Sequence, residues 1–338
     1  MFTKFKGFVK SFSALFVALI GVGTVSATTA LTQAPSTSGS YDYKKYEQSV
    51  SATAMMHLAA EASQGPLLEM YEKKMELKNN DIEGWKHIEE ETYENNMSYA
   101  LWVNKYDKTT YVLVYAGTDH IQDTLDYVPM ETSENRSKQM NKAVEVAKSI
   151  KGTIEQKHAE DAETYGELEK LYICGHSLGG YLSMYIASDL IDSFLGYENT
   201  LITIDDIGFE DCSNLRNLKD RLQCVTFGAP GVYYEELKLI PTTHWQKQKV
   251  EVNEQQLYDD FITQHVNSRD PVGNLFQYEK FNKFKHLGRK IYYEIDKVSL
   301  MTLTDFFMKH KNWLGAGIAY TPVYYHMPWV YVNAINGK

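Results

Sequence analysis

Apolar and polar positions follow two different spacings along the chain. In short runs the apolar residues are continuous or alternate with polar ones, which is typical of β-strands. In longer segments they recur every three or four residues, as on one face of an α-helix. This pattern predicts strands at 99–104, 110–115, 168–175, 201–204, 222–227, 262–267 and 290–295, and helices at 42–63, 134–158 and 178–194.

The order of these elements predicts the fold class. Residues 105–108 (Lys-Tyr-Asp-Lys) join two strands directly and indicate a hairpin, whereas helices separate several of the later strands. The charged stretch 69–94 is expected to form a pair of surface helices. Strands that alternate with helices make a mostly parallel sheet with helices on both faces. We therefore predict one α/β domain over residues 41–338, with its site at the carboxyl ends of the strands.

A glycine-rich motif joins a predicted strand to the next predicted helix. Residues 175–180 read Gly-His-Ser-Leu-Gly-Gly and match the G-x-S-x-G pattern in the strand–turn–helix context that it requires. The turn is strained, so its flanking residues must be small. It presents a hydroxyl at a helix N-terminus, where amides and the helix dipole favour an oxyanion. Ser177 is therefore the candidate nucleophile, and an idle serine in a glycine-rich turn is the alternative.

Several segments, in order along the chain, resemble motifs of the class 3 lipases. Besides the serine motif these are 111–118 (Tyr-Val-Leu-Val-Tyr-Ala-Gly-Thr), 225–231 (Val-Thr-Phe-Gly-Ala-Pro-Gly) and 266–272 (Val-Asn-Ser-Arg-Asp-Pro-Val). The resemblance spans about residues 43 to 331 and is specific only at these motifs. It implies an α/β-hydrolase fold and the hydrolysis of carboxylic esters.

The chain departs from that family in two respects. Ala116 stands where the family usually has arginine, so interactions that an arginine makes there are lost. Inserts at 205–222 and 233–260 lengthen the interval between nucleophile and acid. The rim around the substrate is therefore not predicted.

Asp270 is the candidate acid of a Ser-His-Asp triad. A serine hydroxyl becomes a good nucleophile only when a histidine takes its proton, and a carboxylate must orient that histidine. The chain order in this fold is serine, acid, histidine. Asp270 follows a predicted strand directly, and the resemblance gives it the acid role. An ordinary Asp-Pro turn is the alternative.

The base is chosen among four histidines. His265 precedes the acid and lies inside a predicted strand, and His286 resembles a family segment whose histidine is not the base. His310 lies in a predicted apolar-faced helix and is kept as the reserve candidate. His326, in Tyr-His-Met-Pro-Trp-Val-Tyr at 325–331, resembles the late family segment that carries the catalytic histidine, and it is our choice.

Two amides are expected to stabilise the oxyanion. One belongs to Leu178, the residue after the nucleophile. The other, by resemblance, belongs to Thr118, and Gly117 allows the backbone to approach the substrate closely. Residues 119–130, which come directly after Thr118, carry apolar residues on one face of a short helix. A mobile lid and a fixed surface helix remain equal alternatives for this segment.

The N-terminal segment has the pattern of a secretory signal peptide. Three lysines precede an apolar stretch at 12–22, and Val-Ser-Ala at 25–27 supplies the small residues of a cleavage site. We expect a signal peptide at 1–27 and a flexible leader at 28–40, with cleavage after Ala30 as the second choice. The localisation that this predicts is extracellular, and an uncleaved anchor is the alternative.

Composition and other motifs restrict the function further. The net charge of −10 argues against a general affinity for nucleic acid, and no later segment is long and apolar enough to span a membrane. No metal-binding or phosphate-binding motif is present in the sequence, so no cofactor is implied. Of three cysteines, Cys174 is expected in the core. Cys212 and Cys224 form either a disulfide, which an exported protein permits, or two free thiols.

These observations together predict a secreted serine hydrolase acting on an acyl ester, in solution or at a lipid interface. A lipase or phospholipase-like esterase is the first interpretation. A short-chain or carbohydrate esterase or an acyltransferase is the alternative within enzymes, because fold and triad do not set the acyl pocket. A catalytically inactive binding protein on the same scaffold is the alternative outside them.

Overall fold

The structure is a computed structural model, and it describes most of the chain between residues 43 and 337. The predicted signal peptide at 1–27 and leader at 28–40 lie outside the described residues. Those residues are 43–62, 71–72, 75, 82–93, 97–117, 138–197, 200–233, 254–270, 272–274, 284–295 and 325–337.

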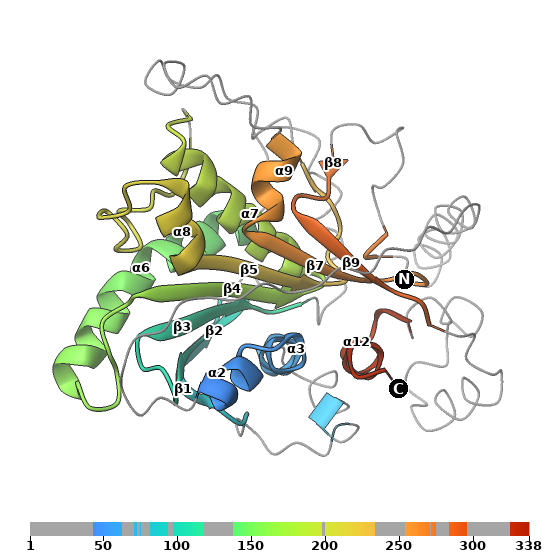
Figure 1. Cartoon of the computed structure of the whole chain (residues 1–338), viewed down its shortest axis with the longest axis horizontal. Coiled ribbons are helices and arrows are strands. Elements are labelled where there is room, and N and C mark those ends of the chain that lie inside the picture. Colours follow the sequence, from blue (N-terminus) through green and yellow to red (C-terminus); the bar gives the residue numbers. More distant parts are fainter. Residues whose placement is uncertain are drawn as a thin grey trace, which may run out of the picture.

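A seven-stranded sheet, with the order β1-β2-β3-β4-β5-β7-β9, forms the centre of the fold (Figure 1). The first three strands pair antiparallel, and from β3 onward every neighbouring pair is parallel. The predicted mostly parallel sheet is therefore confirmed. The strands are β1 (Trp85–Thr92), β2 (Ser98–Asn104), β3 (Thr110–Tyr115), β4 (Lys170–His176), β5 (Leu222–Phe227), β7 (Ile262–Asn267) and β9 (Arg289–Tyr293).

Helices cover both faces of this sheet, as the α/β fold class requires. Figure 1 shows α6, α7, α8 and α9 on one side and α2, α3 and α12 on the other. A separate pair, β6 (Val232–Tyr233) with β8 (Phe284–Lys285), completes the described elements. The helices are α2 (Tyr43–Ser49), α3 (Ala52–Glu61), α6 (Lys138–Glu160), α7 (Leu178–Phe194), α8 (Leu215–Arg221), α9 (Glu254–Asp259) and α12 (Pro328–Ile335).

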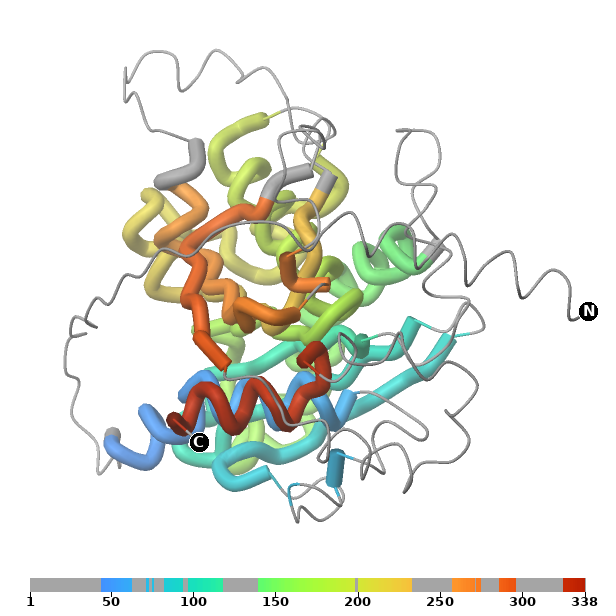
Figure 2. The backbone as a smooth tube through the Cα atoms, turned by 90° about the vertical axis from the view of Figure 1, so that its right-hand side faces the viewer, coloured from blue at the N-terminus to red at the C-terminus, as the bar shows by residue number. Residues whose placement is uncertain are grey.

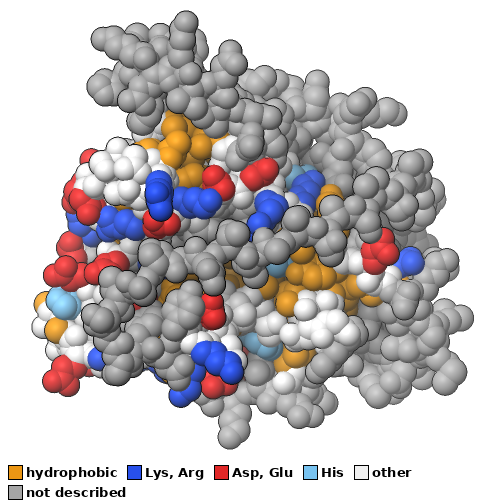
Figure 3. All heavy atoms as spheres, in the orientation of Figure 1, with side chains coloured by type: hydrophobic (Ala, Val, Ile, Leu, Met, Phe, Trp, Pro, Cys, Tyr) orange, Lys and Arg blue, Asp and Glu red, His pale blue; other side chains and the backbone are white. Residues whose placement is uncertain are grey.

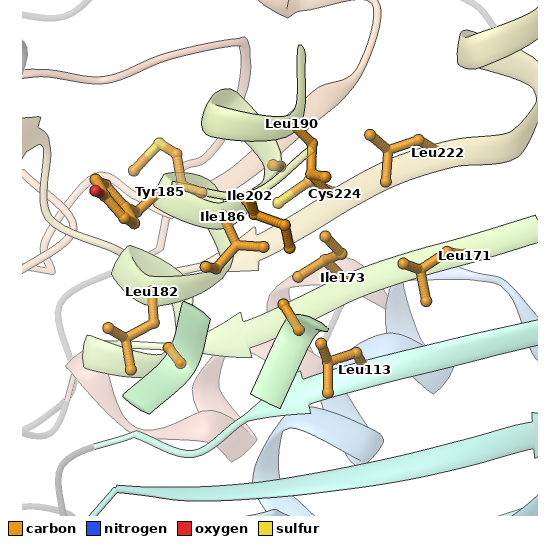
Figure 4. Close-up of a cluster of buried hydrophobic side chains, with 14 of the residues drawn as sticks. Leu113, Leu171, Ile173, Leu182, Tyr185, Ile186, Leu190, Ile202, Leu222 and Cys224 are labelled. Atoms are coloured by element: carbon orange, nitrogen blue, oxygen red, sulfur yellow. The ribbon is translucent and has the colours of Figure 1, made fainter. Parts of the chain in front are cut away.

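Each face of the sheet has its own hydrophobic cluster, because successive strand residues point to opposite sides. In β4, Leu171 and Ile173 belong to the cluster under α6 and α7, while Tyr172 and Cys174 face the cluster under α3 and α12. Figure 4 shows Leu171 and Ile173 on the same side of the sheet as residues of α7 such as Ile186. The central strands are thus buried on both faces, which explains their continuous apolar sequences.

The C-terminal helix α12 lies beside α3 on the second face, as the view in Figure 2 shows. Trp329 and Val330 of α12 pack into the same cluster as Met55 and Leu58 of α3. The last described part of the chain is thereby brought back to the middle of the sheet. This return places the segment before α12 at the carboxyl ends of the central strands.

Three local predictions were wrong. Residues 85–92 form the edge strand β1 instead of a surface helix, and its charges suit an edge that faces water. The predicted helix 42–63 is two helices, because Ser51 caps α3 by accepting a hydrogen bond from the Ala54 amide. Residues 201–204 are not a strand, since the Leu201 and Ile202 amides bind the Asp189 carboxylate.

The structure settles the state of the cysteines, which the sequence left open. All three cysteines are free and buried, so Cys212 and Cys224 form no disulfide. Among the described residues, no helix has the length and apolar character that crossing a bilayer demands. On the face in Figure 3, acidic and basic side chains are interspersed. Exposed ion pairs such as Lys219 with Asp260, at 2.6 Å, occur on the surface of the protein.

Candidate active site

Ser177 stands at the junction between β4 and α7 in a strained conformation. Its φ of 57° and ψ of −123° make it the one non-glycine residue with positive φ in the described part of the chain. Such a conformation costs of the order of 1–3 kcal/mol and is retained where surrounding structure enforces it. Here its amide donates to the Phe227 carbonyl at 2.9 Å, and its carbonyl accepts from the Tyr181 amide. The predicted turn from strand to helix is thus present.

The glycines of the motif are explained by close backbone contacts. A Cβ on Gly175 would lie 2.3 Å from the carbonyl carbon of Gly179, and one on Gly179 would lie 2.0 Å from the Tyr115 carbonyl oxygen. Neither position can hold a side chain while the turn packs against the end of β3. Gly180 is less crowded, since its nearest contact would be the Ala229 side chain at 2.8 Å. The motif therefore encodes a tight approach between β3, β4 and α7.

Asp270 is fully buried just after β7, and its carboxylate accepts three hydrogen bonds. The donors are Nδ1 of His326 at 2.8 Å, the Tyr331 hydroxyl at 2.5 Å and the Val272 amide at 2.8 Å. A buried carboxylate stays ionised only when such partners replace its hydration. The arrangement therefore provides a fixed acceptor that orients one imidazole.

The hydrogen bond to Asp270 fixes the tautomer of His326. A carboxylate only accepts, so the neutral ring carries its proton on Nδ1 and leaves the lone pair of Nε2 available. That Nε2 atom is buried and has no hydrogen-bond partner among the described residues. An unpartnered basic nitrogen next to a fixed carboxylate has the electronic character of a general base.

The nucleophile, acid and base candidates meet at one edge of the sheet. His176, the residue before Ser177, donates from Nε2 to the His326 carbonyl at 2.7 Å, and the two imidazole rings are 4.6 Å apart. A Cβ on Gly228, after β5, would lie 2.6 Å from Asp270 and 3.1 Å from the His326 ring. The fold therefore brings the three sequence-predicted triad residues to the same edge, where Asp270 binds His326. Among the described residues, no hydrogen bond joins Ser177 to Nε2 of His326.

Sequence reasoning missed the role of Tyr331. This residue lies in α12, five positions after His326, and its hydroxyl also accepts from the Asn267 amide at 3.2 Å. Burial, and then the charge of Asp270, raise the pKa of the Tyr331 phenol well above its usual value. The phenol consequently remains a donor to Asp270. The sequence did place Tyr331 in the motif at 325–331 that contains His326. Its contact with Asp270 could not be predicted, because that contact depends on the fold.

The oxyanion candidates are only partly described. Leu178 is buried at the first position of α7, where its amide is one of the N–H groups that a helix leaves free. Gly117 follows β3, and a Cβ there would lie 3.5 Å from the Ser177 Cβ, so this loop reaches the nucleophile. Thr118 and the segment 119–130 lie outside the described residues.

The other histidines occupy different environments. His265 is inside β7, as expected, and burial lowers its pKa to about 3. His286 is buried and its Nδ1 bonds the Gln264 side chain at 3.0 Å. His310 lies outside the described residues. Among the residues that the structure covers, no cluster of histidine, cysteine and acidic side chains could hold a metal ion.

A comparison with protein families matches residues 112–279 to the family described as Lipase (class 3). This interval contains the Ser177 turn and Asp270, and it ends before His326. No curated protein matches the chain at a significant level. The family match therefore covers the candidate nucleophile and the candidate acid but not the candidate base.

Several solved structures are similar in part. A fungal lipase in complex with an inhibitor is 17% identical and matches over 72% of this chain and 78% of its own, with a TM-score of 0.43. The lipase of Rhizopus microsporus var. chinensis is 14% identical and matches over 78% of this chain and 80% of its own, with a TM-score of 0.41. The Lip2 lipase of Yarrowia lipolytica is 14% identical and matches over 75% of this chain and 80% of its own, with a TM-score of 0.38. Likenesses this distant support no statement about the site.

Proposed function

Because the chain belongs to the class 3 lipases, which are carboxylic ester hydrolases, we propose that it is a secreted serine hydrolase that cleaves acyl esters through an acyl-enzyme. The observation that carries the triad is the 2.8 Å hydrogen bond from His326 to Asp270, at the edge where Ser177 stands in its strained turn. In the proposed reaction Ser177 is the nucleophile, His326 is the base and then the acid, and Asp270 orients His326.

In the first half of the reaction the Ser177 hydroxyl attacks the ester carbonyl carbon. Nε2 of His326 accepts the hydroxyl proton, and Asp270 stabilises the imidazolium that forms. The same proton then passes to the oxygen of the departing alcohol as the ester C–O bond breaks. Ser177 is left acylated, and His326 is neutral again.

In the second half a water molecule takes the place of the alcohol. His326 accepts a proton from this water, which attacks the acyl carbon and releases the carboxylic acid. The Leu178 and Thr118 amides hold the negative oxygen in both tetrahedral states. Losing one such donor costs about 2.7–4 kcal/mol of transition-state stabilisation in a well-studied protease.

A fluorophosphonate probe tests this proposal at the level of one atom. Wild-type protein should gain one adduct, and peptide mass spectrometry should place it on Ser177. The Ser177→Ala variant should gain none. An inert wild-type protein, or an adduct on a different residue, would mean that the scaffold has another function.

We further propose an acyl-lipid substrate, in keeping with the family. p-Nitrophenyl esters of increasing chain length, measured with and without lipid micelles, test this point. A rate increase at the micelle surface is expected. A preference for acetate without any such increase would leave an ester hydrolase and reject the lipase.

The proposed secretion rests on the N-terminal sequence. Lysines, an apolar stretch and small residues succeed one another over residues 1–27, in the order that a signal peptidase requires. Exported protein should therefore begin at Thr28, or at Leu31 if the second site is used. N-terminal sequencing that finds residue 1 retained would contradict the proposal.

A further inference from the structure

Two side chains bind consecutive backbone carbonyls of the base segment, which we define as residues 325–327 with His326 at its centre. Asn267, at the end of β7, donates from Nδ2 to the Tyr325 carbonyl at 2.8 Å, and His176, at the end of β4, donates from Nε2 to the His326 carbonyl at 2.7 Å. Both donors are buried, with exposed fractions of 0% and 7%. Two strands that are not neighbours in the sheet thus hold one short segment between them.

We propose that His176 and Asn267 are positioning residues for the base: by fixing the carbonyls of residues 325 and 326, they hold the His326 ring in line between Ser177 and Asp270. The inference rests on the proposed function, because it assumes that His326 is the base. It assigns a role to two side chains that touch neither the substrate nor the reacting atoms.

The chemistry of His176 suits this role. A carbonyl oxygen only accepts, so the proton of the neutral ring is on Nε2. Burial, and secondly the nearby charge of protonated His326, keep the pKa of His176 well below its usual value. The ring therefore stays uncharged while His326 becomes positive 4.6 Å away. A second positive charge at this distance would oppose the imidazolium that the reaction forms.

The orientation of the Asn267 amide is fixed from both ends. Its Oδ1 accepts from the Arg269 amide at 2.9 Å, so Nδ2 must face the Tyr325 carbonyl. A flipped amide would lose both hydrogen bonds. The Asn267 backbone amide also donates to the Tyr331 hydroxyl, which in turn donates to Asp270. Asn267 therefore fixes the base segment and the donor to the acid together.

The base segment needs such support because a proline comes directly after it. Pro328 opens α12 and has no N–H, so the chain next to His326 offers one donor fewer for its own anchoring. Displacement of a catalytic group by about 1 Å can cost of the order of 10²-fold in rate. Holding two adjacent carbonyls restricts movement of the backbone that carries the ring, while the hydrogen bond to Asp270 restricts the ring's rotation.

Three substitutions at one position separate the hydrogen bond from the size of the side chain. In His176→Gln the amide nitrogen takes the place of Nε2, in His176→Asn it takes the place of Nδ1, and His176→Phe retains a ring without a donor. We expect the Gln variant to keep kcat within about threefold of wild type. The Asn and Phe variants should lower kcat by about 10–100-fold with KM within about twofold.

His265→Phe is the matched control. It also removes a buried imidazole at this edge, together with a hydrogen bond to the Tyr293 hydroxyl at 2.7 Å, but it does not touch the base segment. Its kcat should remain within about threefold of wild type, whatever its melting temperature. If the Phe variant of His176 does not fold, the Asn and Gln variants, which differ by one methylene, carry the comparison.

Hydrogen exchange supplies a readout that does not depend on activity. Peptides covering residues 325–331 should exchange faster in His176→Phe and Asn267→Ala, and at the wild-type rate in His176→Gln and His265→Phe. The proposal is overturned if Phe at 176 leaves kcat or exchange unchanged, or if Gln lowers kcat as far as Phe does. A wild-type protein that neither cleaves esters nor labels at Ser177 would refute the proposed function, while the exchange rates would still test the positioning.

Discussion

Two buried carboxylates in this protein bind a tyrosine in the same way and are suited to different tasks. Asp270 accepts the Tyr331 hydroxyl at 2.5 Å, and Asp192 accepts the Tyr258 hydroxyl at the same distance. Both aspartates are almost completely buried. Burial and a tyrosine partner therefore do not distinguish the candidate catalytic acid from another buried carboxylate.

The difference lies in where the two carboxylates stand. Asp270 follows a parallel strand at the edge that carries Ser177, and it binds His326. Asp192 lies 15 positions along the chain from Ser177, which corresponds to about 22 Å of α7, and its partner comes from α9. The Asp192 pair ties two helices together, whereas the Asp270 pair orients an imidazole.

This comparison teaches that the chemistry of the site comes from topology. The carboxyl ends of parallel strands bring residues from distant parts of the sequence to one edge. A carboxylate there can meet an imidazole and a hydroxyl. The same carboxylate within a helix face is available only for packing and stability.

The two aspartates should respond oppositely to the same isosteric change. Asp270→Asn should lower kcat by about 10⁴-fold, as in a serine protease in which the equivalent change leaves the wrong histidine tautomer. Asp192→Asn should leave kcat within about threefold and lower the free energy of unfolding by about 1 kcal/mol. Steady-state kinetics and urea unfolding measure the two effects. Equal losses of activity in both variants would remove the distinction.

A matched pair of glycines tests the same contrast through sterics. Gly228 and Gly208 both have positive φ, but a Cβ would lie 2.6 Å from Asp270 in the first and 3.5 Å from the Lys151 side chain in the second. Gly228→Ala should displace the acid and lower kcat by about 10²-fold.

Gly208→Ala is the control, and it carries only the backbone strain of about 1–2 kcal/mol. Melting curves report the strain in both variants, and initial rates report the displacement. If Gly228→Ala is no less active than Gly208→Ala, the Asp270 position is not critical.

The two tyrosines should differ by a smaller factor. Tyr331→Phe removes one of three donors to Asp270 and should lower kcat about tenfold, the equivalent of about 1.4 kcal/mol. Tyr258→Phe should leave kcat unchanged and cost about 1–3 kcal/mol of stability, because the buried Asp192 carboxylate loses a donor. A Tyr331→Phe enzyme with wild-type kcat would show that the remaining two donors orient the acid sufficiently.

Acid should loosen the candidate site, residues 262–270 and 325–331, before it loosens the region around Asp192. Burial lowers the pKa of His176 well below 6.5 and that of His265 to about 3, whereas residues 186–197 and 254–260 contain no histidine. These rings stay neutral in the folded state and take up protons when unfolded. Their contribution to stability is therefore complete above about pH 6.5 and is lost as the pH falls below it.

The free energy of unfolding should fall by up to about 1.4 kcal/mol per pH unit for each of these two histidines. The His265→Phe variant should lack the contribution of His265 to this slope. Urea unfolding between pH 6.5 and 4.5 measures the slope. Hydrogen exchange should rise in 262–270 and 325–331 before it rises in 186–197. Uniform loosening of the three segments would contradict the assignment.

Local patterns in the sequence predicted the turn around Ser177 well. The predicted helix at 178–194 has the bounds of α7, because glycines and an apolar strand define that junction within a few residues. The charged edge strand β1 was missed, since its eight residues show little apolar periodicity. The amides of residues 201 and 202 were read as part of a strand, because their partner Asp189 lies on α7.

The parts of the candidate site that are close together in the sequence were predicted better than those that the fold brings together. Asp270 and His326 are 56 positions apart, and it was the family resemblance that paired them before the fold brought them together. Tyr331, Asn267 and His176 were not assigned their contacts, because each depends on which strand ends become neighbours. Thr118 remains a prediction from resemblance alone.

The acyl-enzyme itself offers the most direct test of the account. A p-nitrophenyl ester mixed with stoichiometric enzyme and quenched in acid within milliseconds should leave its acyl group on the peptide that contains Ser177, in step with a burst of nitrophenol. Asp270→Asn should show neither burst nor adduct on that timescale. Ester turnover with the acyl group on another residue, or with no acylated peptide and no burst, would contradict the account.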